Sequence, residues 1–421
     1  MNKFVVSAGL AASGAMALDM ACKAQSALFG DAKDWNASAS LQGFYDSNYN
    51  IGATQKGSYG IQLSPTITAT IPLTQTQIGI LYTYGVQWYQ QRQQDNVNAY
   101  DQQHTVNVWV DHAFDERWDL KVADVFNVGQ EPELLQGGGT VYRVNGNNIA
   151  NNATVTLNTE WTREFSTALI YQNNYYDYQS QPYAGSLNRV DNAPELDLQW
   201  HLTPETTLFV GYQFEIENYL DNSIIAYYPP GTMDNPYYSD SRDNLNHYGY
   251  VGAQMNLLPN LVAAARVGFQ YYETLNDPLG NTSDTSPYAD LSLIYTYNPG
   301  CNAQLGFTQN RAATDVVTVN TSNYSITQDL LSSSVYASVN HQLTPKLLLS
   351  VIGRITDSQY NGGEFDNQWQ TAYSLGVSAN YAFTRHLSGQ AGYNYDDVNA
   401  PEGSGQSYSR NRVYVGFGVA Y

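Results

Sequence analysis

Residue types that carry catalysis or bind metals are present in the sequence but form no recognised motif. No His-x-x-His or Cys-x-x-Cys spacing occurs, so a structural zinc site is not expected. A Gly-x-Ser-x-Gly nucleophile elbow and a Walker loop are also absent, and Gly137-Gly138-Gly139 is interpreted as a flexible turn. We therefore predict no catalytic, cofactor-binding or metal site and no enzyme, with a hydrolase acting at a barrel rim as the weaker alternative.

Acidic residues in one predicted loop are the candidates for ion binding. Asp234, Asp240 and Asp243 lie close together in the sequence, and carboxylate oxygens are the ligands that Ca²⁺ prefers. They do not follow the spacing of an EF-hand. Specific Ca²⁺ binding therefore remains an alternative to the simpler interpretation, in which these residues are solvated loop charges.

Charged residues that alternate with apolar ones along predicted strands are the best candidates for a functional surface. Alternation turns them away from the apolar face and toward a shared interior. Opposed basic and acidic rings set the ion preference of a pore; alternatively, the charges pair and only hold the wall together. The predicted pore-lining charges are Arg266, Arg354, Arg410, Arg412, Asp111, Glu160, Asp197, Glu215, Glu217, Asp290 and Asp396, with Lys121 as a further candidate.

Composition limits the classes of protein and partner. Only 13% of the residues are charged, against about 25% in a typical soluble domain. The net charge of −20 argues against nucleic acid, whose phosphates it would repel, and predicts a mild preference for cations in an open lumen. After residue 25 no run of 18 apolar residues occurs, so no transmembrane helix is predicted. A closed barrel can nevertheless span a membrane, because it also satisfies every backbone group.

A two-residue rhythm predicts the elements that position these charges. In residues 59–71 most odd positions are apolar, whereas most even positions are Ser or Thr; residues 207–217 and 261–271 alternate similarly. The polar face carries mostly Ser, Thr, Gly, Gln and Asn, which suits a wet lumen better than the surface of a soluble sandwich. Residues 118–128 fit poorly, since Asp124 falls on the apolar face, and a β-bulge is one explanation.

Short turns recur along the chain, and longer polar loops separate them. Eight such turns join sixteen strands, and one strand at each end brings the total to about eighteen, within two. Short turns at one end and long loops at the other are typical of outer-membrane barrels. The predicted fold is thus an all-β transmembrane antiparallel up-and-down barrel with short periplasmic turns and longer extracellular loops. Loops 129–151 and 219–243 are candidates to fold inward. The turns lie at residues 73–75, 114–117, 162–164, 202–205, 258–260, 298–300, 343–346 and 383–386.

The first residues have the pattern of an export signal. Lys3 is followed by a small, apolar stretch over residues 4–18, and a cleavage site is expected after Ala24. We predict a signal peptide at 1–24, a short periplasmic segment at 25–34 and a single barrel domain at 35–421. Cys22 leaves a lipoprotein as the weaker alternative.

The last eight residues look like the C-terminal assembly signal of outer-membrane proteins. That pattern is matched by Gly416, Val419 and Tyr421. With the stretches 115–118, 124–126 and 130–134, nearly the whole mature chain resembles the putative β-barrel porin 2 family of Gram-negative bacteria. The resemblance implies a bacterial outer-membrane barrel that the barrel assembly machinery inserts.

The predicted function is that of an outer-membrane porin for passive diffusion of small hydrophilic solutes or ions, with a weak preference for cations. The alternative is a non-conducting scaffold or surface-binding barrel. Expected partners are outer-membrane lipid and lipopolysaccharide, the assembly machinery and small solutes or ions, but not nucleic acid and no cofactor. A homotrimer is an open alternative, and the sequence specifies neither the solute nor an open or plugged lumen.

Overall fold

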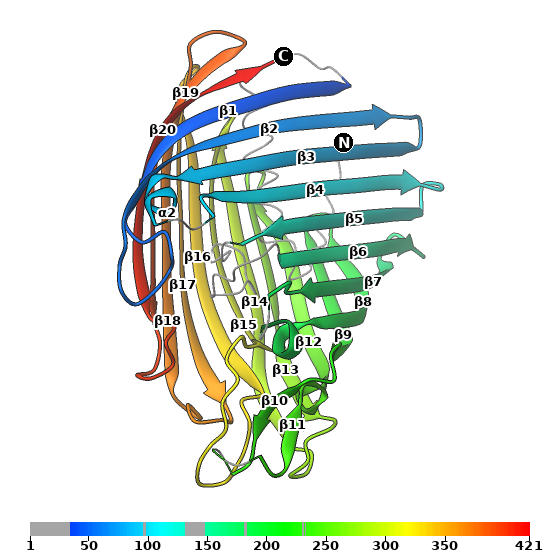
Figure 1. Cartoon of the computed structure of the whole chain (residues 1–421). Coiled ribbons are helices and arrows are strands. Elements are labelled where there is room, and N and C mark those ends of the chain that lie inside the picture. Colours follow the sequence, from blue (N-terminus) through cyan, green and yellow to red (C-terminus); the bar gives the residue numbers. More distant parts are fainter. Residues whose placement is uncertain (1–33, 96–97, 131–147, 181–182, 230, 232) are drawn as a thin grey trace.

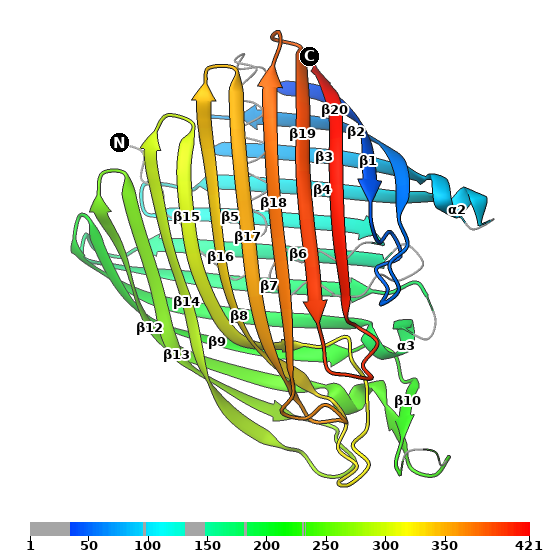
Figure 2. The same ribbon diagram turned by 90° about the vertical axis from the view of Figure 1, so that its left-hand side faces the viewer.

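Eighteen antiparallel strands form one closed sheet, as the sequence predicted (Figures 1 and 2). The computed structural model describes residues 34–95, 98–130, 148–180, 183–229, 231 and 233–421, so the predicted signal peptide lies outside the described residues. The barrel strands are β1 (Trp35–Asp46), β2 (Ser58–Pro72), β3 (Thr76–Tyr89), β4 (Tyr100–Ala113), β5 (Trp118–Gly129), β6 (Asn148–Glu160), β7 (Phe165–Asp177), β8 (Arg189–Thr203), β9 (Thr206–Tyr219), β12 (Asn244–Leu258), β13 (Leu261–Thr274), β14 (Ser283–Asn298), β15 (Cys301–Ala313), β16 (Asp329–Thr344), β17 (Leu347–Asn361), β18 (Trp369–Ala382), β19 (Leu387–Asn399) and β20 (Tyr408–Ala420).

The first and last strands close the barrel. β1 pairs with β20 from Ser38 opposite Ala420 to Asp46 opposite Arg412. Figure 2 shows the red β20 beside the blue β1 at this seam. Closure removes the unpaired edges that an open sheet of this size would expose.

The two faces of the sheet differ as the alternation predicts. Ile61 and Ile67 in β2, and Val415 and Phe417 in β20, are each more than half exposed. A continuous apolar surface of this kind exceeds what soluble monomers expose. Near the short turns Trp118 and Trp161 pack edge to face with ring centroids 5.8 Å apart, which suits a membrane interface. No helix in the described ranges is long and apolar enough to cross a membrane.

Strand β5 contains no bulge, so that interpretation of Asp124 was wrong. The register of β5 with β4 and with β6 runs without a shift. Asp124 does lie on the outer face, opposite Val108. Its Oδ1 accepts a hydrogen bond of 2.8 Å from Asn151 Nδ2 on β6, which gives this polar side chain a partner.

The loops gather at the end opposite the short turns. They include helices α2 (Gln90–Gln94) and α3 (Tyr183–Leu187), and the segment between β9 and β12 holds strands β10 (Ile224–Tyr227) and β11 (Pro236–Tyr238) and the 3-10 helix η1 (Ser239–Arg242). The β10–β11 hairpin extends beyond the strand ends in Figures 1 and 2, so this part of loop 219–243 does not enter the barrel. Most of loop 129–151 lies outside the described residues.

Candidate functional site

The predicted pore-lining charges lie on the inner face, but they are not gathered in one place. Register places Arg266 opposite Asp290, Arg410 opposite Asp396 and Lys121 opposite Asp111. Cross-strand neighbours share a face of the sheet, and the exposed apolar residues hold the alternate positions. The charges occupy the β1–β20 seam (Arg410, Arg412, Asp396), one wall (Asp197, Glu215, Glu217, Arg266, Asp290), β17 (Arg354) and the short-turn end (Asp111, Glu160).

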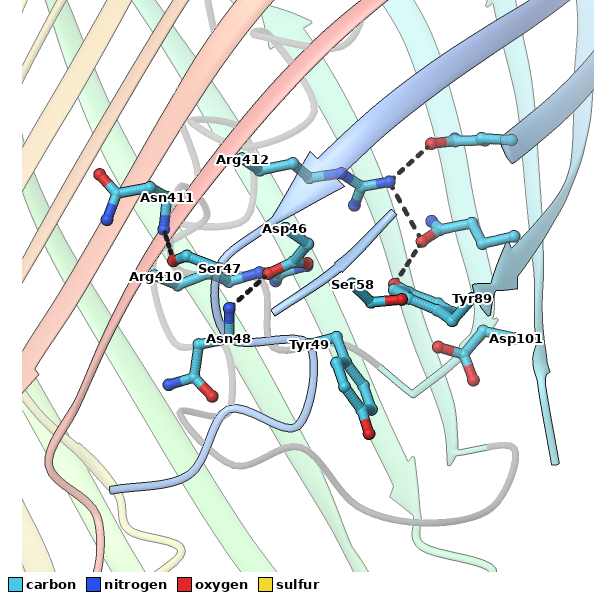
Figure 3. Close-up of polar contacts among 12 residues, drawn as sticks. Asp46, Ser47, Asn48, Tyr49, Ser58, Tyr89, Asp101, Arg410, Asn411 and Arg412 are labelled. Carbon is cyan, nitrogen blue, oxygen red and sulfur yellow. Dashed lines mark hydrogen bonds and ion pairs between the residues drawn. The ribbon is translucent and has the colours of Figure 1, made fainter. Parts of the chain in front are cut away.

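At the seam, buried charges pair with one another (Figure 3). Asp46 is fully buried. Its Oδ2 accepts hydrogen bonds from Arg410 Nε at 2.9 Å and from Nη2 at 2.6 Å. Arg412 Nη2 donates to Gln62 and Gln87 at 3.0 and 3.2 Å. These contacts link β20 to β1, β2 and β3, so this group holds the closure together.

The residues of the predicted assembly signal lie on β20 and just after it. Val419 and Tyr421 are exposed on the outer face. Gly416 faces β1 so closely that an added Cβ would lie 2.3 Å from the backbone oxygen of Leu41. A glycine is therefore required at 416 for the seam to close, whatever its role in assembly.

A second group, which we call the paired cluster, consists of Glu195, Asp197, Tyr250 and Arg266. Arg266 Nη1 donates to Glu195 Oε1 at 2.9 Å, and Nη2 donates to Asp197 Oδ2 at 3.2 Å. The Tyr250 hydroxyl donates to the same two carboxylates at 2.7 and 2.8 Å. Its ring lies against Gly211, where an added Cβ would be 2.1 Å from a ring carbon. The glycine thus lets the ring lie flat on the wall and reach both carboxylates.

A third group, which we call the acidic cluster, consists of Asp191 on β8 and Glu215 and Glu217 on β9. One carboxylate oxygen of each residue lies within 4.8 Å of the others. Asp191 and Glu217 are direct cross-strand partners. The sequence predicted no metal site; carboxylates from two strands meet here through register alone.

The acidic cluster has less compensating charge than the paired cluster. Arg189 Nε lies 3.9 Å from Asp191 Oδ1, which is beyond hydrogen-bond distance. Glu215 Oε2 accepts from the Tyr248 hydroxyl at 3.0 Å. Throughout the described part of the chain, no Lys, Arg or His nitrogen lies within 4.0 Å of Glu215 or Glu217.

A cavity of about 250 Å³ in the lumen joins this cluster to the other side of the barrel. Arg354 lines it from β17 and is only 6% exposed. Its guanidinium lies 5.1 Å from the centre of the Tyr336 ring, and no carboxylate within the described ranges comes within 4.0 Å of it. The other polar residues that line the cavity include Asn152, Gln172, Asn174, Gln213, Asn244, Asn246, Thr308, Asn310, Ser332, Ser334, Thr356, Ser358 and Gln370.

Several charged residues of the lumen were missed from the sequence. Asp191 and Glu195 share the parity of Asp197 along β8, so extending the alternation along that strand would have found both. Arg311 gives no such signal. Alternation groups it with Leu305, which is 51% exposed on the outer face, yet Arg311 lines the cavity and donates to Asp329 at 2.8 Å.

Comparison with known proteins gives one family and a set of distant structural likenesses. Residues 35–421 match the family described as "Putative beta-barrel porin 2". No curated protein matches the sequence. Similar solved structures include the outer membrane protein opdK from Pseudomonas aeruginosa, which is 9% identical with a TM-score of 0.43 over 93% of this chain and 100% of that chain. Acinetobacter baumannii OccAB3 is 12% identical with a TM-score of 0.43, over 92% and 100% of the two chains. Pseudomonas aeruginosa OccK2 (OpdF) in complex with glucuronate is 10% identical with a TM-score of 0.44, over 92% and 98%.

Proposed function

Because the chain belongs to the putative β-barrel porin 2 family and is therefore an outer-membrane porin, we propose that small hydrophilic solutes or ions cross it by passive diffusion through the lumen. The observation that carries this proposal is the polar inner wall. Barrels of sixteen to eighteen strands are wide enough to hold an aqueous channel. The cavity between β8–β9 and β15–β18 is lined by amides, hydroxyls and charges, which suit hydrated solutes.

A weak preference for cations is the second part of the proposal. The net charge of −20 attracts cations toward the protein. Inside the lumen, Glu215 and Glu217 lack a cationic neighbour within 4.0 Å among the described residues. Arg354 acts in the opposite direction, so the expected preference is small.

Liposome swelling tests the diffusion step. Purified protein in vesicles should let small sugars and amino acids enter at rates that fall steeply with solute size, and it should give discrete conductance steps in a planar bilayer. A correctly folded barrel that shows neither swelling nor conductance would overturn the proposal.

A non-conducting scaffold is the second candidate, and one observation favours it. Arg242 is fully buried in the loop region and donates to the backbone oxygens of Ser186 and Thr314 at 3.2 and 2.6 Å. These bonds tie three loops together at the loop end of the barrel. If they close the lumen, Arg242→Ala should turn a silent barrel into a conducting one; a wild-type protein that already conducts excludes this candidate.

A further inference from the structure

The acidic cluster carries more negative charge than its surroundings compensate. It holds three carboxylates, and among the described residues Arg189, whose Nε lies 3.9 Å from Asp191 Oδ1, is the one guanidinium within 4.0 Å of them. When all three are ionised, two negative charges remain. Like charges held this close on a buried surface repel each other strongly, and one divalent cation would remove the excess.

Unsatisfied buried atoms point to a ligand at the same place. Asp191 Oδ1 and Glu217 Oε1 have no hydrogen-bond partner among the described residues, although the two residues are only 7% and 5% exposed. The hydroxyl of Tyr272, which is 2% exposed and lines the same cavity, also has none. Buried polar atoms are almost always satisfied by protein, water or an ion. This tyrosine is outside the carboxylate group, so it is a second buried polar group that faces the same cavity.

We propose that Asp191, Glu215 and Glu217 bind one divalent cation, and that Ca²⁺ is the ion whose chemistry fits. Ca²⁺ takes six to eight oxygen ligands at about 2.3–2.6 Å in an adaptable geometry. Two oxygens on opposite sides of such an ion are about 5 Å apart, and the three carboxylate oxygens lie within 4.8 Å of one another. Water in the cavity completes the ligand shell.

The carboxylates of this site are held in place by contacts that do not involve the ion. Tyr248 and Gln213 donate to Glu215 Oε2 at 3.0 and 3.4 Å, so one oxygen of this residue is already oriented. Asp191 and Glu217 are fixed by the β8–β9 register. A site whose ligands are held before the ion arrives loses less conformational entropy on binding.

Ion binding stands on this geometry alone, whereas its effect on permeation rests on the proposed function. A bound divalent cation cancels the negative charge that faces the lumen. In a conducting barrel, Ca²⁺ should therefore reduce the preference for monovalent cations.

Terbium luminescence tests the site in the full-length mature protein, folded in detergent and stripped with EDTA. Tb³⁺ replaces Ca²⁺ at oxygen sites and is sensitised by nearby tyrosines, and Tyr248 contacts Glu215 directly. We expect saturable Tb³⁺ emission that Ca²⁺ displaces. The double variant Glu215→Gln/Glu217→Gln should bind about 100-fold more weakly, because affinity follows ligand charge. Glu402→Gln, an exposed loop carboxylate, should bind as wild type does.

Three outcomes would overturn the site. These are an absence of saturable, Ca²⁺-displaced emission in wild type, wild-type affinity in the double variant, and equal weakening in Glu402→Gln. If the double variant does not fold, Asp191→Asn replaces it with the same expected loss. Conductance measured on the same samples separates the two proposals: conductance without binding removes only the site, and binding without conductance removes only the proposed function.

Discussion

One wall of the barrel holds two clusters of buried carboxylates that differ in whether a guanidinium donates hydrogen bonds to them. Strand β8 supplies Glu195 and Asp197 to the paired cluster and Asp191 to the acidic cluster. In the paired cluster, Arg266 on β13 donates to both carboxylates. In the cavity beside the acidic cluster, the residue from β13 is Tyr272, which carries no positive charge. The same strands therefore carry a structural ion pair at one position and a cluster with only partial charge compensation at the other.

Structural charges in a barrel lumen can be distinguished from functional ones by the partners of each buried carboxylate. A buried carboxylate with a guanidinium donor has the partner that its burial requires. A buried carboxylate without one must be protonated, solvated by ordered water or bound to an ion. Substitutions that remove a charge should therefore destabilise the paired cluster and stabilise the acidic cluster.

The largest expected effect is the loss of Arg266. Arg266→Gln strands Glu195 and Asp197 without their cation and should lower the free energy of unfolding by about 3–5 kcal/mol. Arg354→Gln is the matched control, because Arg354 is equally buried but has no carboxylate within 4.0 Å in the part of the chain described here. It should not lower the free energy of unfolding comparably, because no buried carboxylate loses its partner. Denaturant unfolding in detergent, followed by tryptophan fluorescence, measures both; equal losses would erase the distinction.

Replacing a glutamate by glutamine should change the stability of the barrel in opposite directions in the two clusters. Without divalent cations, Glu195→Gln should destabilise the barrel by about 1–3 kcal/mol, since Arg266 loses a charged acceptor. Glu217→Gln should instead stabilise it by about 1 kcal/mol, because a repulsion between carboxylates is removed. Added Ca²⁺ should stabilise wild type and not Glu217→Gln. Unfolding curves with EDTA and with Ca²⁺ give all four values, and destabilisation by both substitutions in EDTA would contradict the comparison.

Asp243 is an intermediate case outside the barrel strands, and it gives the smallest effect. Burial raises the pKa of Asp243 to about 6, although the Tyr219 amide and Asn276 donate to it. The folded state therefore holds the proton more strongly than the unfolded chain, in which a carboxyl titrates near 4. Loop stability should rise as pH falls from 7 through 6. The protection factors of the backbone amides in residues 220–229 and 233–243 should rise correspondingly between pH 7 and pH 5, and Asp243→Asn should remove this response; an unchanged response in that variant would exclude Asp243 as its source.

Much of the fold follows from residue types and spacing. Alternation in 59–71 and 207–217 identified the faces of β2 and β9, and the count of short turns gave eighteen strands. These features are local, since each depends only on the two-residue period and on turn residues. The bulge expected at Asp124 was wrong because alternation cannot show that Asn151, on the next strand, provides a hydrogen bond.

The site was less predictable because it depends on register between strands. Parity placed Glu215 and Glu217 on the inner face, but it did not show that Asp191 lies opposite Glu217 or that Arg266 pairs with Glu195 and Asp197. Such pairings join residues far apart in the sequence, and charge type alone does not select among them. Arg311 shows a second reason why sequence alternation failed, because near a loop its side chain does not follow the inward–outward alternation of the strand.

Reversal potentials in asymmetric potassium chloride depend on both an open lumen and the charge of the acidic cluster, so they test conduction and selectivity together. We predict a conducting wild type with a small cation preference that Ca²⁺ reduces, and a Glu215→Gln/Glu217→Gln barrel with less preference and no response to Ca²⁺. A folded wild type that does not conduct, or a double variant with unchanged selectivity, would contradict this account.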